Sequence, residues 1–151
     1  MRAGPARADL HDETGSTLLL TIFYGFLSLV LILVAVAATS LYLERKRLFT
    51  VADGAALVGA EAFDLDRVAP DEAGLLRPRL ETSEVQQAVR AYLDGNPVTD
   101  FDGLTLERAE SVDGLSATVA LSAQWKPPLV SLLVPEGIRI DVEAVARSVF
   151  W

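Results

Sequence analysis

The chain has 151 residues and a formal charge of −8, from 13 basic and 21 acidic side chains. It contains no cysteine and one histidine, which excludes a disulfide framework, a thiolate or multi-histidine metal site and a cysteine nucleophile. The acidic balance argues against a nucleic-acid-binding protein, which needs a basic surface to neutralise phosphates. Residues 1–60 carry no net charge, so the acidity belongs to the rest of the chain.

Residues 17–43 form an uncharged apolar run of 27 residues. About 20 helical residues cross a bilayer core of about 30 Å, so this run is long enough to span it once. We therefore predict a single-pass transmembrane helix in contact with the lipid bilayer. The alternative is a buried core helix, but so short a chain has little protein with which to cover the segment on all sides.

A second alternative is a cleaved signal peptide, because Ala35-Val36-Ala37 has the small-x-small form of a signal peptidase site. Cleavage there would release a secreted soluble domain. The apolar stretch before this site is longer than a usual signal sequence, and the tail before it is not positively charged. Basic residues are nearly balanced on the two sides of the run, so charge leaves the orientation in the membrane open.

A stripe of small residues follows the apolar run. Ala52, Ala56 and Ala60 recur every four residues, which places them on one face of a helix. Small residues on such a face let another helix approach closely. Glycine inside a helix costs about 1 kcal/mol relative to alanine, so helix propensity alone does not account for Gly54 and Gly59. The predicted helix-packing interface consists of Ala52, Asp53, Ala55, Ala56, Gly59 and Ala60.

Three sequence blocks in this region carry a resemblance to a known family. They are Gly15-Ser16, the segment YLERKRL of residues 42–48, and the block ADGAALVGA of residues 52–60. In this order, and around a transmembrane helix, they resemble the N-terminal region of TadE/TadG-type proteins of tight-adherence (Tad, or Flp) pilus systems. The similarity covers residues 12–63, about the first third of the chain.

The resemblance implies an accessory, minor pseudopilin-like component of a Tad/Flp-type pilus assembly or secretion system. It implies a place in the cytoplasmic (inner) membrane, with the N-terminus inside and the C-terminal domain outside. The implied partners are other pilus or pseudopilin subunits and assembly platform proteins, in a hetero-oligomer. Gly15 and Ser16 correspond to the processing site of the family. The TadE subgroup has a glutamate five residues after this glycine, where this chain has Leu20, so we expect the anchored TadG-like type.

Residues 64–82 are rich in proline, glycine and charge, and we predict a linker there. A helix then begins, with Thr82 or Ser83 as its N-cap. Apolar residues recur at helical spacing, and Gly95 and Pro97 end the helix. The predicted apolar face consists of Val85, Ala88, Val89, Tyr92 and Leu93.

The hydrophobic period then changes to two, which predicts strands at 104–111, 115–125 and 138–149. Asp113-Gly114 is a hairpin signal between the first two strands. We expect a three-stranded antiparallel sheet whose apolar face is covered by the 83–94 helix and the end of the membrane helix. The fold class is therefore α+β and pilin-like: a long N-terminal transmembrane helix, then a second helix and the sheet.

The loop at 126–137 has an apolar centre bracketed by prolines. It either folds over the open end of the sheet or forms a contact patch centred on Leu132 and Leu133. The predicted organisation has five parts: an N-terminal tail (1–16), a transmembrane helix (17–43), a helix extension (44–63), a linker (64–82) and an α+β head domain (83–151).

No motif in the sequence indicates catalysis. His11 lies in the charged tail without a serine and acid around it. The acids at 64–72 and 100–102 lack the spacing of a calcium loop, and there is no glycine-rich phosphate loop. We expect a protein that is not an enzyme and binds no cofactor, metal or nucleic acid. The alternative function is a membrane-tethered extracytoplasmic binding module unrelated to pili.

Overall fold

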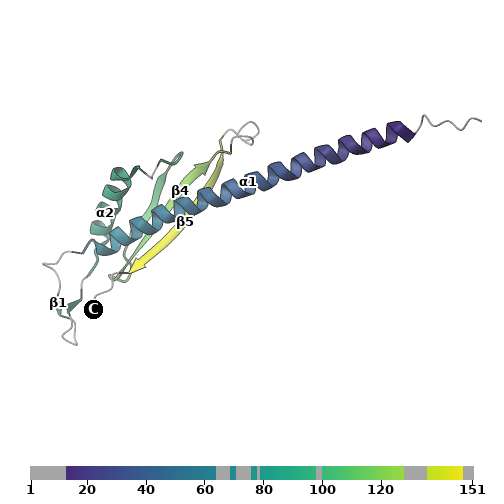
Figure 1. Ribbon diagram of the computed structural model, residues 1–151. Helices are drawn as coiled ribbons and strands as arrows, with labels where there is room; N and C mark the ends of the chain where they lie inside the picture. Colours follow the sequence, from purple (N-terminus) through teal and green to yellow (C-terminus); the bar gives the residue numbers. More distant parts are fainter. Residues whose placement is uncertain are drawn as a thin grey trace, which may run out of the picture. The chain divides into compact units, whose positions relative to one another are not determined.

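The computed structural model describes residues 13–63, 69–70, 76–77, 79–97, 100–127 and 136–147. The chain divides into two units, Met1–Thr39 and Ser40–Trp151. Helix α1 (Glu13–Glu61) runs without a break through the boundary between them (Figure 1). The predicted membrane helix and its extension are therefore parts of one helix.

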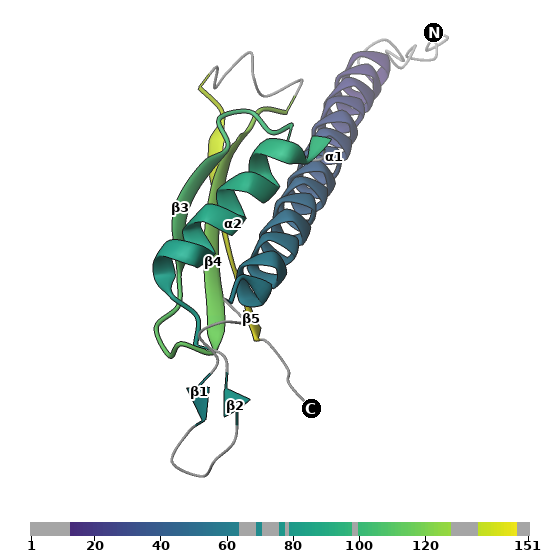
Figure 2. The ribbon, with the colours of Figure 1, turned by 90° about the vertical axis from the view of Figure 1, so that its left-hand side faces the viewer.

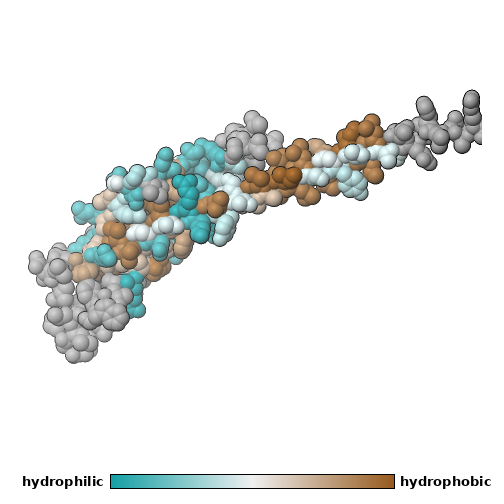
Figure 3. All heavy atoms as spheres, viewed as in Figure 1, coloured by the Kyte–Doolittle hydropathy of each residue, from teal (hydrophilic) through white to brown (hydrophobic). Residues whose placement is uncertain are grey.

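In the first unit, α1 exposes large apolar side chains all around its circumference. Among the described residues it is the one helix long and apolar enough to cross a membrane, and none of its most apolar window is buried. Figure 3 shows a largely hydrophobic surface along this part of the helix. Because such a surface is unfavourable in water, the segment has the character of a membrane anchor.

The second unit has two layers. Its sheet contains β3 (Thr105–Glu110), β4 (Ser116–Trp125) and β5 (Ile138–Arg147), all antiparallel and in the order β3-β4-β5. Helix α2 (Thr82–Gly95) and the last part of α1 lie side by side on one face of this sheet (Figure 2). This arrangement confirms the predicted α+β class and the predicted cover of the sheet.

The core lies between the two layers and follows the alternation in the sequence. In β4 the buried apolar residues alternate, and they face α1 and α2. Leu121, Val119, Leu48, Val85 and Val89 are the largest side chains that are fully buried. Burial of each stabilises the unit by about 1.5–3 kcal/mol relative to exposure.

The hairpin between β3 and β4 forms around Asp113 and Gly114, as predicted. The Asp113 carboxylate accepts hydrogen bonds from the backbone N–H groups of Leu115 and Ser116, at 2.9 and 2.7 Å, and from the Ser116 hydroxyl at 2.8 Å. Gly114 has φ +67°, a conformation that suits a residue without Cβ. These bonds fix the turn that sets the register of the two strands.

The predicted capping of α2 is wrong. The N-cap residue is Glu81, which makes no side-chain capping hydrogen bond. The Thr82 hydroxyl instead donates to the carbonyl of Ser111 and accepts from its backbone N–H, each at 3.3 Å. Its side chain therefore connects the start of α2 to the end of β3 and does not cap its own helix.

The predicted linker contains paired backbone. Two very short strands, β1 (Ala69–Pro70) and β2 (Leu76–Arg77), form an antiparallel ladder. Two residues are too few for an alternating pattern to be visible in the sequence, so the sequence predicts only a linker there.

Candidate functional site

The small-residue stripe of α1 packs against this chain's own α2 and sheet. Ala52, Ala55, Ala56 and Ala60 have no exposed surface. A Cβ at Gly59 would lie 3.1 Å from a Val85 methyl, 3.2 Å from Ala117 Cβ and 3.3 Å from a Val89 methyl. At Gly59, therefore, α1, α2 and β4 approach one another closely.

This placement corrects our interpretation of the stripe as a surface for other subunits. The residues do form a packing interface, but it is internal to the Ser40–Trp151 unit and no partner helix can reach it. Small residues on a helix face indicate close packing. They do not show whether the packing partner is another chain or a later part of the same chain. Asp53 is the exception, since its side chain is exposed.

Three further contacts that the sequence did not reveal hold α1 in place. A Cβ at Gly54 would lie 2.5 Å from the Tyr92 hydroxyl, so the glycine makes room for this ring. The Trp125 indole N–H donates to the Ser40 hydroxyl at 3.3 Å, and the Arg47 guanidinium lies 5.3 Å from the Phe101 ring centroid. The sequence predicts a strand that ends at Trp125, and the need of the indole N–H for an acceptor is the one feature that indicates a bond of this kind.

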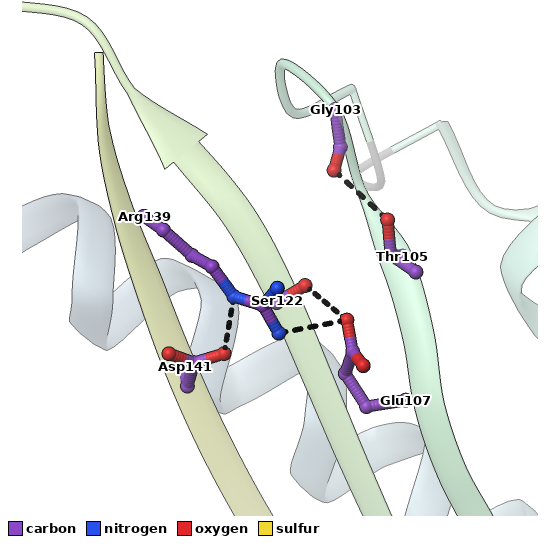
Figure 4. Close-up of polar contacts among 6 residues, drawn as sticks. All are labelled: Gly103, Thr105, Glu107, Ser122, Arg139 and Asp141. Atoms are coloured by element: carbon purple, nitrogen blue, oxygen red, sulfur yellow. Dashed lines mark hydrogen bonds and ion pairs between the residues drawn. The ribbon is translucent and has the colours of Figure 1, made fainter.

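The other face of the sheet carries a polar network (Figure 4). Glu107 lies at an irregularity of the β3–β4 register, between Leu106 and Arg108. Its carboxylate accepts a hydrogen bond from the Ser122 hydroxyl at 2.6 Å. The same carboxylate forms an ion pair with the Arg139 guanidinium at 3.0 Å. The network covers Ser122, which is only 4% exposed although its hydroxyl is polar and lies on this face of the sheet.

Arg139 connects this network to β5. Its Nε donates to Asp141 at 2.9 Å, and this hydrogen bond and the charges of Asp141 and Glu107 raise the pKa of the guanidinium. Arg108 lies 3.8 Å from Glu110 and 3.6 Å from Glu143. Both signs of charge are therefore interleaved on this face, and each charged side chain of the network has a partner of opposite sign.

The outward face of α1 in the second unit is formed by Tyr42, Lys46, Phe49, Asp53 and Leu57. Tyr42, Phe49 and Leu57 are 66%, 48% and 54% exposed, although each is large and apolar. Lys46 and Asp53 are also exposed. Exposed apolar side chains that gather on one face of a helix are typical of protein contact surfaces.

The described residues offer no metal site. They contain no group of three or more side chains that could hold a metal ion. Arg45 and Phe49, together with the three long strands, line an open pocket of about 450 Å³, whose charged walls include both signs. The predicted positions His11, Leu132 and Leu133 lie outside the described residues. Gly15 and Ser16 lie in the first turn of α1, where processing stays a prediction.

Comparison with known families gives a match to the long helix. Residues 15–62 match the model of a family described as putative Flp pilus-assembly TadE/G-like. The match coincides with α1 and confirms the resemblance recognised in the three sequence blocks. Searches of curated proteins and of solved structures gave no significant match.

Proposed function

We propose that this chain, whose residues 15–62 match the TadE/G-like family model, is an accessory, minor pseudopilin-like component of a Tad/Flp-type pilus assembly or secretion system. The single observation that carries the proposal is the coincidence of the family match with the long apolar helix α1. In this role α1 anchors the chain in the cytoplasmic membrane. The N-terminus is inside and the Ser40–Trp151 unit is outside.

The proposed activity is protein contact rather than catalysis. The partners are other pilus or pseudopilin subunits and assembly platform proteins, in a hetero-oligomer. Two surfaces of the second unit support this role: the outward face of α1, with its exposed apolar side chains, and the polar sheet face around Arg139. The small-residue stripe is not one of them, because the chain itself covers it.

Orientation can be tested with a single thiol, because the chain has no cysteine of its own. Val112 is 85% exposed, so a Val112→Cys variant presents a reactive thiol on the second unit. In spheroplasts, a membrane-impermeant maleimide should label this variant without lysis. An Ala3→Cys variant is the matched control and should be labelled only after lysis. The reverse pattern would contradict the proposed topology.

The pilus role is tested by deleting the gene in a host that assembles Tad-type pili. Surface pili should be lost and restored by the wild-type chain. They should not be restored by a Leu29→Lys/Ile32→Lys variant, in which each charge in the span costs about 2.5–3.5 kcal/mol of insertion free energy. A deletion strain with normal pili would contradict the pilus role and favour the unrelated binding module.

A further inference from the structure

The second unit contacts α1 before the apolar run ends. Ser40 is the first residue of this unit, and its hydroxyl accepts a hydrogen bond from the Trp125 indole N–H at 3.3 Å. The apolar run continues to residue 43. Composition therefore places Ser40 in the predicted span, whereas the hydrogen bond attaches it to the end of β4.

Charged side chains lie beside this bond. Lys126 follows Trp125 in the chain, and its Nζ lies 3.7 Å from the Asp102 carboxylate. The Gln124 backbone N–H donates to the Asp102 carbonyl at 2.8 Å, which holds Asp102 next to the end of β4. We call these five residues the Ser40 end of the second unit: Ser40, Asp102, Gln124, Trp125 and Lys126. Its charges are costly in hydrocarbon, so the Ser40 end lies outside a bilayer core.

The part of the apolar run before Ser40 is long enough to span a bilayer by itself. Residues 17–39 are 23 uncharged residues. As a helix they have a length of about 34 Å, and a bilayer core is about 30 Å thick. A bilayer around α1 therefore has its core within residues 17–39, and residues 40–43 lie at the level of the head groups. Tyr42, which is 66% exposed, suits this level because tyrosine is enriched at membrane interfaces.

The Ser40 end is hollowed at this level. An open pocket of about 340 Å³ is lined by its five residues together with Glu44 and Asp100. The wall that α1 contributes reaches from Ser40 to Glu44, about 6 Å along the helix, and the head-group layer on each side of a bilayer is about 5–8 Å thick. The pocket therefore has the depth of one layer of phospholipid head groups.

We propose that the Ser40 end of the second unit binds phospholipid head groups of the membrane that anchors α1, with Lys126 toward phosphate and Asp102 toward ammonium groups. The exposed pair of opposite charges matches a zwitterionic head group, which carries the same two charges. Phosphatidylethanolamine fits best, because its ammonium donates N–H bonds that a carboxylate accepts, whereas a quaternary ammonium has no N–H. The proposal rests on the proposed membrane anchoring and extends it to the folded unit.

Thiol reactivity tests the depth, since the chain has no cysteine that would give a background. Full-length Tyr42→Cys and Val36→Cys chains, both changed at exposed positions of α1, are placed in nanodiscs of phosphatidylethanolamine and phosphatidylcholine. With a charged maleimide, Tyr42→Cys should react at least about tenfold faster, because hydrocarbon excludes both the thiolate and the reagent. Equally slow reaction at the two positions would place residue 42 in the core and overturn the proposal.

A fluorophore on a Gln124→Cys chain tests contact with the head groups, in nanodiscs whose lipids carry a nitroxide quencher on the head group. Val112→Cys is the matched control. It is 85% exposed beyond the opposite end of β4, and the ten residues of this strand span about 30 Å. The label at position 124 should be quenched several-fold more than the label at position 112. Equal quenching of the two would overturn the proposal.

The charges are tested with the same label. Lys126→Glu should lower the quenching at position 124, because an acid then faces the phosphates. Arg147→Glu changes the net charge equally but lies opposite Ser116, at the far end of β4, and should leave the quenching unchanged. Equal losses from the two variants would overturn the role of Lys126. Nanodiscs of phosphatidylcholine alone should also lower the quenching, and unchanged quenching there would overturn the assignment to phosphatidylethanolamine.

Two outcomes separate this inference from the proposed function. If the chains do not elute with the nanodiscs, the proposed membrane anchoring fails and this inference fails with it. If they elute with the nanodiscs but Tyr42→Cys is protected as well as Val36→Cys, the anchor stands and this inference alone is wrong. Circular dichroism of each variant shows whether the α+β fold is retained, so that lost quenching is not mistaken for unfolding.

Discussion

A Cβ at Gly59 would lie 3.1–3.3 Å from three neighbouring side chains, so a large side chain there has no room. A Gly59→Leu variant should lower the free energy of unfolding of the Ser40–Trp151 unit by about 1–3 kcal/mol, because leucine there overpacks the core. The measurement is urea unfolding in detergent micelles, followed by tryptophan fluorescence. Gly95→Leu is the matched control, since nothing lies within 4 Å of the position of its Cβ. Equal effects at the two sites would contradict the close approach.

Asp113 couples the β3–β4 turn to pH. The N–H groups of Leu115 and Ser116 and the Ser116 hydroxyl hold the pKa of its carboxyl at about 2, below the ordinary value of 3.8. Its contribution to stability is therefore present above pH 3.8 and lost as the pH falls towards 2. Thermal melts of wild type and Asp113→Asn should differ at pH 7 and converge near pH 2. A difference that stays constant with pH would count against this role for the carboxylate.

At the level of single residues, the sequence indicated which positions are special but not what they contact. Gly59 was recognised because glycine is unfavourable inside a helix, and the structure shows that it admits Val85 and Val89. Thr82 was predicted as a capping residue, but in the structure its hydroxyl forms a hydrogen bond with the Ser111 carbonyl instead. Both contacts join segments far apart in the chain, and local propensity contains no information on them.

The polar network on the outer face of the sheet predicts that removal of Glu107 destabilises the fold. A Glu107→Ala variant should lose about 1–2 kcal/mol of unfolding free energy, because it removes the acceptor of the buried Ser122 hydroxyl. Denaturant unfolding measures this loss. Glu143→Ala is the control and should cost about 0.5 kcal/mol or less, since its pair with Arg108 is exposed.

The double variant Glu107→Ala/Ser122→Ala shows whether the hydrogen bond is the cause. When both partners are apolar, no buried hydroxyl lacks an acceptor, and most of the stability should return. A double variant less stable than Glu107→Ala alone would mean that Glu107 acts mainly through Arg139.

At the level of elements, the strands were predicted closely because one face of the sheet is buried. The observed bounds of β3 and β4 lie within a residue of the predicted ones, and β5 begins at the predicted residue. The register irregularity at Glu107 was not predicted, since it depends on how β3 aligns with β4 rather than on either strand. The same holds for β1 and β2, which are too short to have a period.

For the whole molecule, we predict a permanent membrane anchor that is not processed. The reason is that the chain has Leu20 at the position where the TadE subgroup has a glutamate after the processing glycine. Mass spectrometry of the protein from the membrane fraction should find a chain that begins near Met1. A mature N-terminus at Ser16 would show processing at Gly15 and move the protein toward a filament subunit. A start at Ala38, with the protein absent from membranes, would favour the secreted soluble domain.

The bond between Ser40 and Trp125 closes a separation of 85 residues. Ribosomes add about 5–20 residues per second, so Trp125 is made roughly 4–17 s after Ser40. The apolar inner face of α1, from Leu48 to Ala60, is synthesised early and its cover in β4 much later. During biosynthesis this face is therefore bare for seconds, and a holding chaperone or a waiting partner has that interval in which to bind it.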